Sequence, residues 1–105
     1  MGHLNELGAV IAKINEENGW VLLTRESWGE THHVPAMLAL IHSEVSEAVE
    51  AWREDEGEHF AEELADVVIR VLDVATGLGI DMDVAVAQKL AKNRQRAHRH
   101  GGKRL

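Results

Sequence analysis

The 105-residue chain contains no cysteine, no tyrosine, one phenylalanine and one proline. Without cysteine it has neither disulfides nor thiolate metal sites, and this composition fits a reducing, cytoplasmic environment. The single proline, Pro35, leaves long stretches free to form helices. Because aromatic residues are scarce, we expect an aliphatic core of Val, Ala, Leu and Ile.

Long apolar runs and a secretory signal are also missing. No window approaches the uncharged stretch of about 20 residues that a membrane helix needs. The N-terminus lacks a basic region followed by an apolar one. We therefore expect no membrane partner and one small domain, residues 1–105, whose stability would be modest without oligomerisation.

Acidic residues are absent from the last part of the chain, although the net charge is −7. After Asp83 the charged residues are all basic: Lys89, Lys92, Arg94, Arg96, Arg99, Lys103 and Arg104. An acidic middle and a basic end indicate a ligand that needs both signs, such as a metal-complexed polyphosphate. The overall negative charge argues against nucleic acid as the main partner.

Hydrophobic periodicity predicts four helices, at residues 4–17, 35–53, 58–76 and 82–97. Asn18 and Gly19 are predicted to end the first helix, Gly77 and Gly79 to end the third, and Asp81 to cap the fourth. Residues 20–24 resemble a short strand but have no partner strand, so we expect an extended or helical connection there, followed by an irregular segment at 27–33. Residues 54–58, which include Gly57, are the predicted turn. The predicted fold is all-α, a four- to five-helix bundle with a central antiparallel helix hairpin.

Each helix of the hairpin carries an apolar stripe with helical spacing. The residues expected in the core are Leu38, Ile41, Val45, Ala48, Val49 and Trp52 on the second helix, and Phe60, Leu64, Val67, Val68, Val71, Val74 and Ala75 on the third. For the fourth helix they are Val86, Leu90 and Ala97. Further apolar residues flank these stripes, so we expect the hairpin to pack against another subunit as well as its own neighbours.

Two carboxylate pairs lie beside these stripes, Glu44 with Glu47 and Glu63 with Asp66. The i, i+3 spacing places both acids of a pair on one helix face. Ordinary solvated acids often show this spacing, but the duplication and the apolar flanks favour a shared site. Four carboxylates repel one another unless a cation joins them, and all-oxygen ligands favour Mg²⁺ or Mn²⁺.

A basic and polar strip on the fourth helix complements this acidic set. Lys89, Asn93 and Arg96 follow one another at i, i+4 and i+7, and their side chains can reach phosphate oxygens together. Gly101 and Gly102 precede Lys103, a further candidate for phosphate binding. A solvated basic helix end is the alternative interpretation.

These residues resemble the MazG-type all-α nucleoside triphosphate pyrophosphohydrolases. The shared motifs are Glu44-Val-Ser-Glu47, Glu63-Leu-Ala-Asp66, Lys89, Asn93, Arg96 and the segment His100-Gly101-Gly102-Lys103. The resemblance implies Mg²⁺-dependent hydrolysis of a nucleoside or deoxynucleoside triphosphate to a monophosphate and pyrophosphate, in nucleotide-pool house-cleaning. It also implies a homodimer or homotetramer, metal ligation by the four acids, and phosphate binding by the Lys, Asn and Arg.

The sequence departs from the family pattern at Ser43, where many relatives carry a glutamate that is a candidate for activating the attacking water. One of the remaining carboxylates would then take the proton, and Glu47 is our choice. The metal itself lowers the pKa of a bound water, so a strong separate base is not strictly required.

Trp20 and Trp28 precede the hairpin and are candidates for stacking on a nucleobase. A second kind of metal site, with histidine ligands, is also conceivable from the sequence. Glu30-Thr-His-His33 and Glu56-Gly-Glu-His59 match the E-x-x-H pattern of di-iron bundles. Both segments fall at predicted helix starts or in loops, which disfavours that reading.

Two other functions are compatible with the sequence. Phosphoribosyl-ATP pyrophosphohydrolase shares the expected fold and suits the chain length, although the Gly-Gly-Lys ending fits the MazG type better. A non-catalytic helical interaction protein, whose basic tail binds nucleic acid or an acidic partner, belongs to a different class. Assays with phosphoribosyl-ATP separate the first from the leading hypothesis, and salt-dependent nucleic-acid binding without hydrolysis would favour the second.

Overall fold

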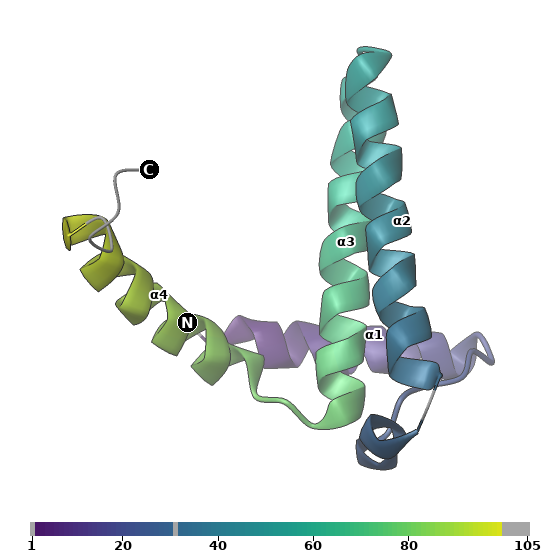
Figure 1. The fold of residues 1–105 in the computed structure, drawn as a ribbon. Helices are drawn as coiled ribbons and strands as arrows, with labels where there is room; N and C mark the ends of the chain where they lie inside the picture. The colour runs from purple at the N-terminus through teal and green to yellow at the C-terminus, as the bar shows by residue number, and fades with distance from the viewer. Residues whose placement is uncertain (1, 31, 100–105) are drawn as a thin grey trace.

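The computed structural model describes residues 2–30 and 32–99, and the side chains up to Arg96. Its elements are α1 (His3–Glu17), the 3-10 helix η1 (Arg25–Gly29), α2 (His33–Arg53), α3 (Gly57–Leu78) and α4 (Met82–Arg99) (Figure 1). No strand occurs among these residues, so the predicted all-α class is confirmed. None of the described helices is both long enough and apolar enough to cross a membrane.

The helices α2 and α3 lie side by side, and the chain rises along α2 and returns along α3 (Figure 1). Between them, Asp55 adopts φ 55°, a left-handed conformation that short polar side chains tolerate. The Glu56 N–H donates to the Ala51 carbonyl at 2.9 Å and closes the turn. Gly57, expected in the turn, is instead the first residue of α3.

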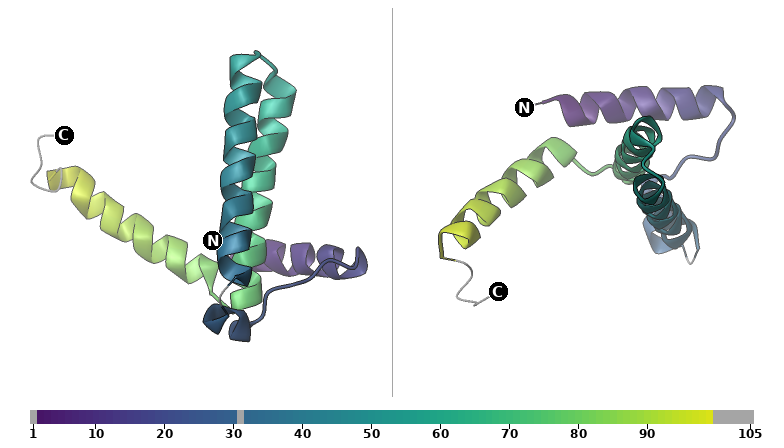
Figure 2. Two further views of the ribbon diagram at one scale, coloured as in Figure 1. Left: turned by 45° about the vertical axis from the view of Figure 1, so that its right-hand side comes forward. Right: turned by 90° about the horizontal axis from the view of Figure 1, so that it is seen from above.

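The first helix crosses the lower part of α3 (Figure 1, Figure 2). Gly8 allows this approach, because a Cβ atom at that position would clash with the Thr76 hydroxyl. The predicted end of α1 is confirmed: Gly19 has φ 74°, and the Trp20 N–H donates to the Asn15 carbonyl at 2.9 Å. The pairing of Gly8 with Thr76 therefore fixes where α1 lies on α3.

Residues 20–24 form neither strand nor helix, and η1 replaces most of the irregular segment expected at 27–33. Leu23 is buried against Gly77, where a Cβ atom would lie 2.7 Å from the Leu23 carbonyl oxygen. Gly77 thus serves packing inside α3 and does not end it, contrary to the prediction. The helix ends at Leu78, and Gly79 follows with φ 76°.

Hydrogen bonds join the N-termini of α1 and α4. Asp81 accepts from the Val84 N–H at 3.0 Å, which confirms it as the cap of α4, and from the Asn5 amide at 2.8 Å. In return, the Met82 N–H donates to Asn5 Oδ1 at 2.9 Å, and the Leu4 N–H donates to Asp83 at 3.0 Å. These bonds satisfy backbone donors that helix starts leave without partners.

Beyond this junction α4 extends away from α2 and α3 (Figure 2). The expected packing of α4 in a compact bundle is therefore wrong for the single chain: Leu90, predicted in the core, is 51% exposed. Val86 is half-buried, and the side chain of Ala97 lies outside the described part. The sequence pattern on α4 marks an apolar face that the described residues of this chain leave partly uncovered.

The predicted core of α2 and α3 is confirmed in part: Ala48, Val74 and Ala75 are buried, whereas several of the larger stripe residues are exposed. The members with exposed fractions above 40% are Leu38, Val45, Val49, Trp52, Leu64 and Val68. Of the small residues on α2, Ala48 from the predicted stripe and Ala51 beside it are buried, and so are Glu63 and Asp73 in the strip of α3 next to its apolar stripe. Small side chains let the backbones approach closely, so the acidic strip faces inward and the large aliphatic residues remain outside.

Candidate active site

The four predicted carboxylates face one another across α2 and α3 in two pairs, Glu44 with Asp66 and Glu47 with Glu63. Glu44 and Asp66 are both 11 residues from Asp55, and Glu47 and Glu63 are both eight. Because two helices that fold back at Asp55 bring equidistant residues together, the position of the turn produces this pairing. The helix periodicity then places both pairs on the same inner face.

Glu63 is the most deeply buried member, with 7% of its surface exposed. Its Oε1 lies 2.9 Å from His59 Nε2, whereas Oε2 is buried without a hydrogen-bond partner in the described part of the chain. Burial raises the pKa of Glu63, and the neighbouring Glu47 carboxyl raises this pKa further. Two facing carboxyl groups need a shared proton or a cation to offset their repulsion, so this pair favours the binding of either.

Glu44 is in a similar state, with 12% of its side chain exposed. Burial is the main cause that raises the pKa of Glu44, followed by a hydrogen bond with Asp66 and repulsion from that group. Arg70 acts in the opposite direction: its Nε lies 3.9 Å from Glu44 Oε2 and lowers the pKa. Here too the free carboxylates repel each other, and a single guanidinium at the edge does not remove the repulsion.

Glu44, Glu63 and Asp66 each place one carboxylate oxygen in a cluster whose atoms all lie within 4.8 Å of one another. Glu47 is outside this cluster and is exposed. Three convergent carboxylates, one with a buried oxygen that has no partner, fit a hard divalent cation such as Mg²⁺ or Mn²⁺. The described residues thus offer the donor set that such an ion requires.

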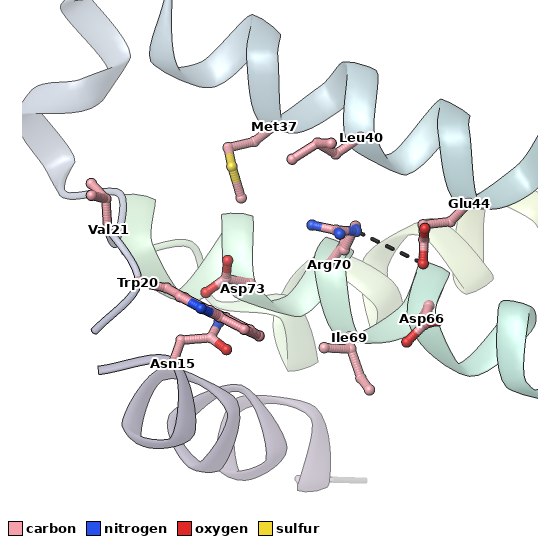
Figure 3. A pocket seen from close by; sticks show the side chains of 10 residues that line it. All are labelled: Asn15, Trp20, Val21, Met37, Leu40, Glu44, Asp66, Ile69, Arg70 and Asp73. Atoms are coloured by element: carbon pink, nitrogen blue, oxygen red, sulfur yellow. Dashed lines mark ion pairs between the residues drawn. The ribbon is translucent and has the colours of Figure 1, made fainter. Parts of the chain in front are cut away.

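A pocket of about 490 Å³ opens beside this cluster (Figure 3). It is lined by Asn15, Trp20, Val21, Met37, Leu40, Glu44, Asp66, Ile69, Arg70 and Asp73. Glu44, Asp66 and Arg70 lie at one end, and Trp20, Asn15 and Asp73 gather at the other (Figure 3). The pocket therefore combines a charged end with a mostly apolar chamber that contains an aromatic ring.

The other predicted site residues lie apart from this pocket. Trp28, on η1, is 75% exposed and does not line it. Lys89, Asn93 and Arg96 are exposed on α4, which leads away from the carboxylates (Figure 2). Lys103 lies outside the described residues. Of the two tryptophans, only Trp20 is in place to contact a molecule in the pocket of the same chain.

The structure also brings in residues to which the sequence assigned no site role. Asn15 and Asp73 are buried at 8% each and line the aromatic end of the pocket. Arg70 is the cationic side chain that lines the charged end. Arg70 and Asp73 follow Asp66 at i+4 and i+7 on the same helix face, and this spacing could have identified them.

Fold and site together define an all-α protein with an acidic cluster next to a ligand-sized pocket. The family model described as the MazG nucleotide pyrophosphohydrolase domain matches residues 32–100, which include all of α2 and α3 and the described part of α4. The chain belongs to this family, and the resemblance noted in the sequence is confirmed. The family implies hydrolase activity on nucleotides and is typically metal-dependent. No curated protein and no solved structure matches the chain.

Proposed function

We propose that this protein is a Mg²⁺-dependent nucleoside triphosphate pyrophosphohydrolase. It would cleave a nucleoside or deoxynucleoside triphosphate with water, between the α and β phosphorus, to a monophosphate and pyrophosphate, and so remove unwanted nucleotides from the pool. The observation that carries the proposal is the convergence of Glu44, Glu63 and Asp66 at the charged end of the pocket. The buried, unpartnered Oε2 of Glu63 supports a cation there.

Glu44, Glu63 and Asp66 would hold the metal, with Glu47 completing the set beside Glu63. Mn²⁺ has similar ligand preferences and is expected to substitute. When bound, such an ion neutralises phosphoryl oxygens and lowers the pKa of a bound water. Glu47 is exposed next to this position and is the proposed acceptor of the proton from the attacking water, since Ser43 cannot take that role.

The nucleoside is proposed to occupy the rest of the pocket. A base stacked on Trp20 would lie between Met37 and Ile69, because these apolar side chains line the same chamber (Figure 3). Asn15 and Asp73 would meet the polar edge of the base, and Arg70 would face the phosphates. This arrangement places the triphosphate towards Glu44 and Asp66, where the metal is required.

A second copy of the chain would complete the site. The exposed stripes on α2, α3 and α4 are the surfaces proposed to pack in a homodimer or homotetramer. Since α4 carries Lys89, Asn93 and Arg96 away from the carboxylates of its own chain, we propose that they bind phosphate in the site of a neighbouring copy. Lys103 is proposed to act beside them.

The direct test is to incubate the protein and Mg²⁺ with a panel of nucleoside and deoxynucleoside triphosphates, and to analyse the products by ³¹P NMR. We expect monophosphate and pyrophosphate, without orthophosphate, and a strong loss of turnover in Glu63→Gln and Asp66→Asn. Glu58→Gln, an exposed acid on the outward side of α3, is the matched control and should retain activity. No turnover on any nucleotide, or turnover that survives both site variants, would refute the proposal.

Two further arms separate the alternatives. Phosphoribosyl-ATP as a competing substrate reveals whether the protein prefers the histidine-pathway reaction, which would replace the proposed one. Salt-dependent binding of DNA or RNA that is lost on deleting residues 99–105, with no hydrolysis, would indicate the non-catalytic interaction protein instead.

A further inference from the structure

His59 lies in the first turn of α3, one helical turn before Glu63. Its imidazole stands between two carboxylates: Nε2 lies 2.9 Å from Glu63 Oε1, and Nδ1 lies 3.2 Å from Glu56 Oε2. The two ring nitrogens thus face different partners and do not converge on a common point. The E-x-x-H pattern noted in the sequence therefore forms a hydrogen-bonded chain of three side chains and no chelate.

Glu56, the outer member of this chain, has a firmly held backbone. Its N–H donates to the Ala51 carbonyl at 2.9 Å, and its own carbonyl accepts from the Phe60 N–H at 2.9 Å. Glu56 is thereby fixed both to the end of α2 and to the first turn of α3. The hydrogen bond between His59 Nδ1 and this carboxylate restricts rotation of the ring, although about half of the His59 side chain is exposed.

Glu63, the inner member, uses its two oxygens differently. Oε1 accepts from the Nε2–H of His59, whereas Oε2 is buried and has no hydrogen-bond partner in the described residues. With one oxygen engaged, the carboxylate cannot rotate freely about its last bond. The Glu63 carboxylate is thereby held in the cluster to which Glu44 and Asp66 also contribute oxygens.

We propose that His59, held in place by Glu56, is a positioning residue that orients the Glu63 carboxylate for the divalent cation. The inference rests on the proposed function, because it assumes that Glu63 is a metal ligand. Hydrogen bonds to ligating groups fix their orientation, and their loss typically weakens metal affinity about 10–100-fold. His59 would thus act on metal binding without touching metal, substrate or water.

The test measures Mn²⁺ affinity of the full chain without nucleotide, by following the electron paramagnetic resonance signal of free Mn²⁺. His59→Leu, which keeps the bulk but removes the donor, should weaken binding about 10–100-fold. His59→Gln, whose amide N–H can replace Nε2–H, should bind nearly as tightly as the unchanged protein. Glu56→Gln should show a smaller weakening, and His3→Leu, an exposed histidine on α1, should show none.

Activity gives a second readout that a purely structural role would not reproduce. In His59→Leu the Mg²⁺ concentration for half-maximal turnover should rise, while turnover at saturating Mg²⁺ should largely recover. Equal Mn²⁺ affinity in the unchanged protein and His59→Leu would overturn the positioning role and leave the proposed function intact. Absence of Mn²⁺ binding by the unchanged protein would overturn both. If His59→Leu does not fold, His59→Asn replaces it, because its shorter amide does not reach Glu63. Equal Mn²⁺ affinity in His59→Gln and His59→Asn would then refute the positioning role.

Discussion

The inner and outer faces of the α2 and α3 pair both differ from those of an ordinary helical protein, because carboxylates share the inner face with apolar residues and large aliphatic side chains lie exposed on the outer face. The inner face carries Glu44, Glu63 and Asp73, all well shielded from solvent, while Val45, Val49 and Val68 lie exposed on the outer face. Burying carboxylates is unfavourable unless something compensates them, and exposing aliphatic side chains is unfavourable in water. The difference agrees with the proposed function, in which a cation binds between the two helices and another copy of the chain covers their outer face.

The largest expected effect comes from removing one inner carboxylate. Glu44→Gln should lower kcat/KM at least about 100-fold, because a catalytic metal contributes several kcal/mol and each 1.36 kcal/mol is tenfold in rate. The metal-free variant should be at least as stable at neutral pH as the unchanged protein, because it no longer buries a repelled charge. Steady-state assays and thermal unfolding check the two statements. Glu50→Gln, on the exposed side of α2 and paired only with Arg53, is the control; equal losses in both variants would mean that the inner face has no special role.

A charge on the outer face should disrupt assembly. We expect the unchanged protein to be a dimer or tetramer by light scattering, and Val68→Lys to be a monomer, because an ammonium group cannot be buried in an apolar contact without a partner. Ser46→Lys places the same charge on the polar side of α2 and should keep the oligomer. If the unchanged protein is monomeric at all concentrations, the exposed stripe has another explanation.

A third surface of α3, where Leu23 packs on Gly77, should behave as ordinary interior. Gly77→Ala places a Cβ atom 2.7 Å from a backbone oxygen, so the chain must shift, and we expect a loss of about 1–3 kcal/mol in the free energy of unfolding in urea. Gly57→Ala, with no atom within 4 Å of the new Cβ, should be neutral or slightly stabilising. Similar values for the two variants would show that Leu23 does not pack there in solution.

The smallest expected effect is a change of folding stability with pH, which arises from the ionisable groups of the inner face. Folding raises the pKa of Glu44 and Glu63 above 4.5 and that of His59 above 6.5, so the stability linked to these groups is present at lower pH and lost as pH rises through the raised values. Glu26 and Asp81 have lowered pKa values, and their contributions disappear only below 4.5 and 3.8. The melting temperature of metal-free protein should therefore fall between about pH 5 and about pH 8.

Added Mg²⁺ should oppose this fall, because a cation favours the ionised carboxylates, and it should raise the melting temperature more at the upper end of the range. Thermal scans with chelator and with Mg²⁺ measure both trends. In Glu44→Gln the dependence on pH should be weaker. A melting temperature that rises with pH in the chelated protein would contradict the assigned state of the inner face.

The sequence predicted the helices well because their signals are local. Helical spacing, the Asn18-Gly19 ending and the Asp81 cap are each contained within a few residues. Local signals could not predict which faces of α2 and α3 pack against each other. Apolar residues cover most of both helices, so periodicity alone does not identify the buried face. Small size at Ala48 and Ala51 decides which face packs inward. The equal distances of the carboxylates from Asp55 were present in the sequence and would have indicated how they pair.

The four predicted carboxylates also come together for a local reason, namely the short turn between α2 and α3. The pocket beside them depends on contacts between residues far apart in the sequence. Asn15 and Trp20 reach the pocket only because α1 crosses α3 at Gly8, and no short motif encodes that crossing. The direction of α4 is likewise invisible in the sequence, because it depends on bonds between residues that are nearly 80 positions apart.

Those bonds give Asn5 an influence far beyond its own helix. Its amide group both donates to Asp81 and accepts from the Met82 N–H, so it joins the N-termini of α1 and α4 at a pivot that Asp83 also helps to hold. In the proposed assembly, a small tilt at this pivot moves Arg96, nearly four helical turns away, by a much larger distance. Asn5, which contacts neither nucleotide nor metal, would then influence where Lys89, Asn93 and Arg96 lie in the site of a neighbouring subunit.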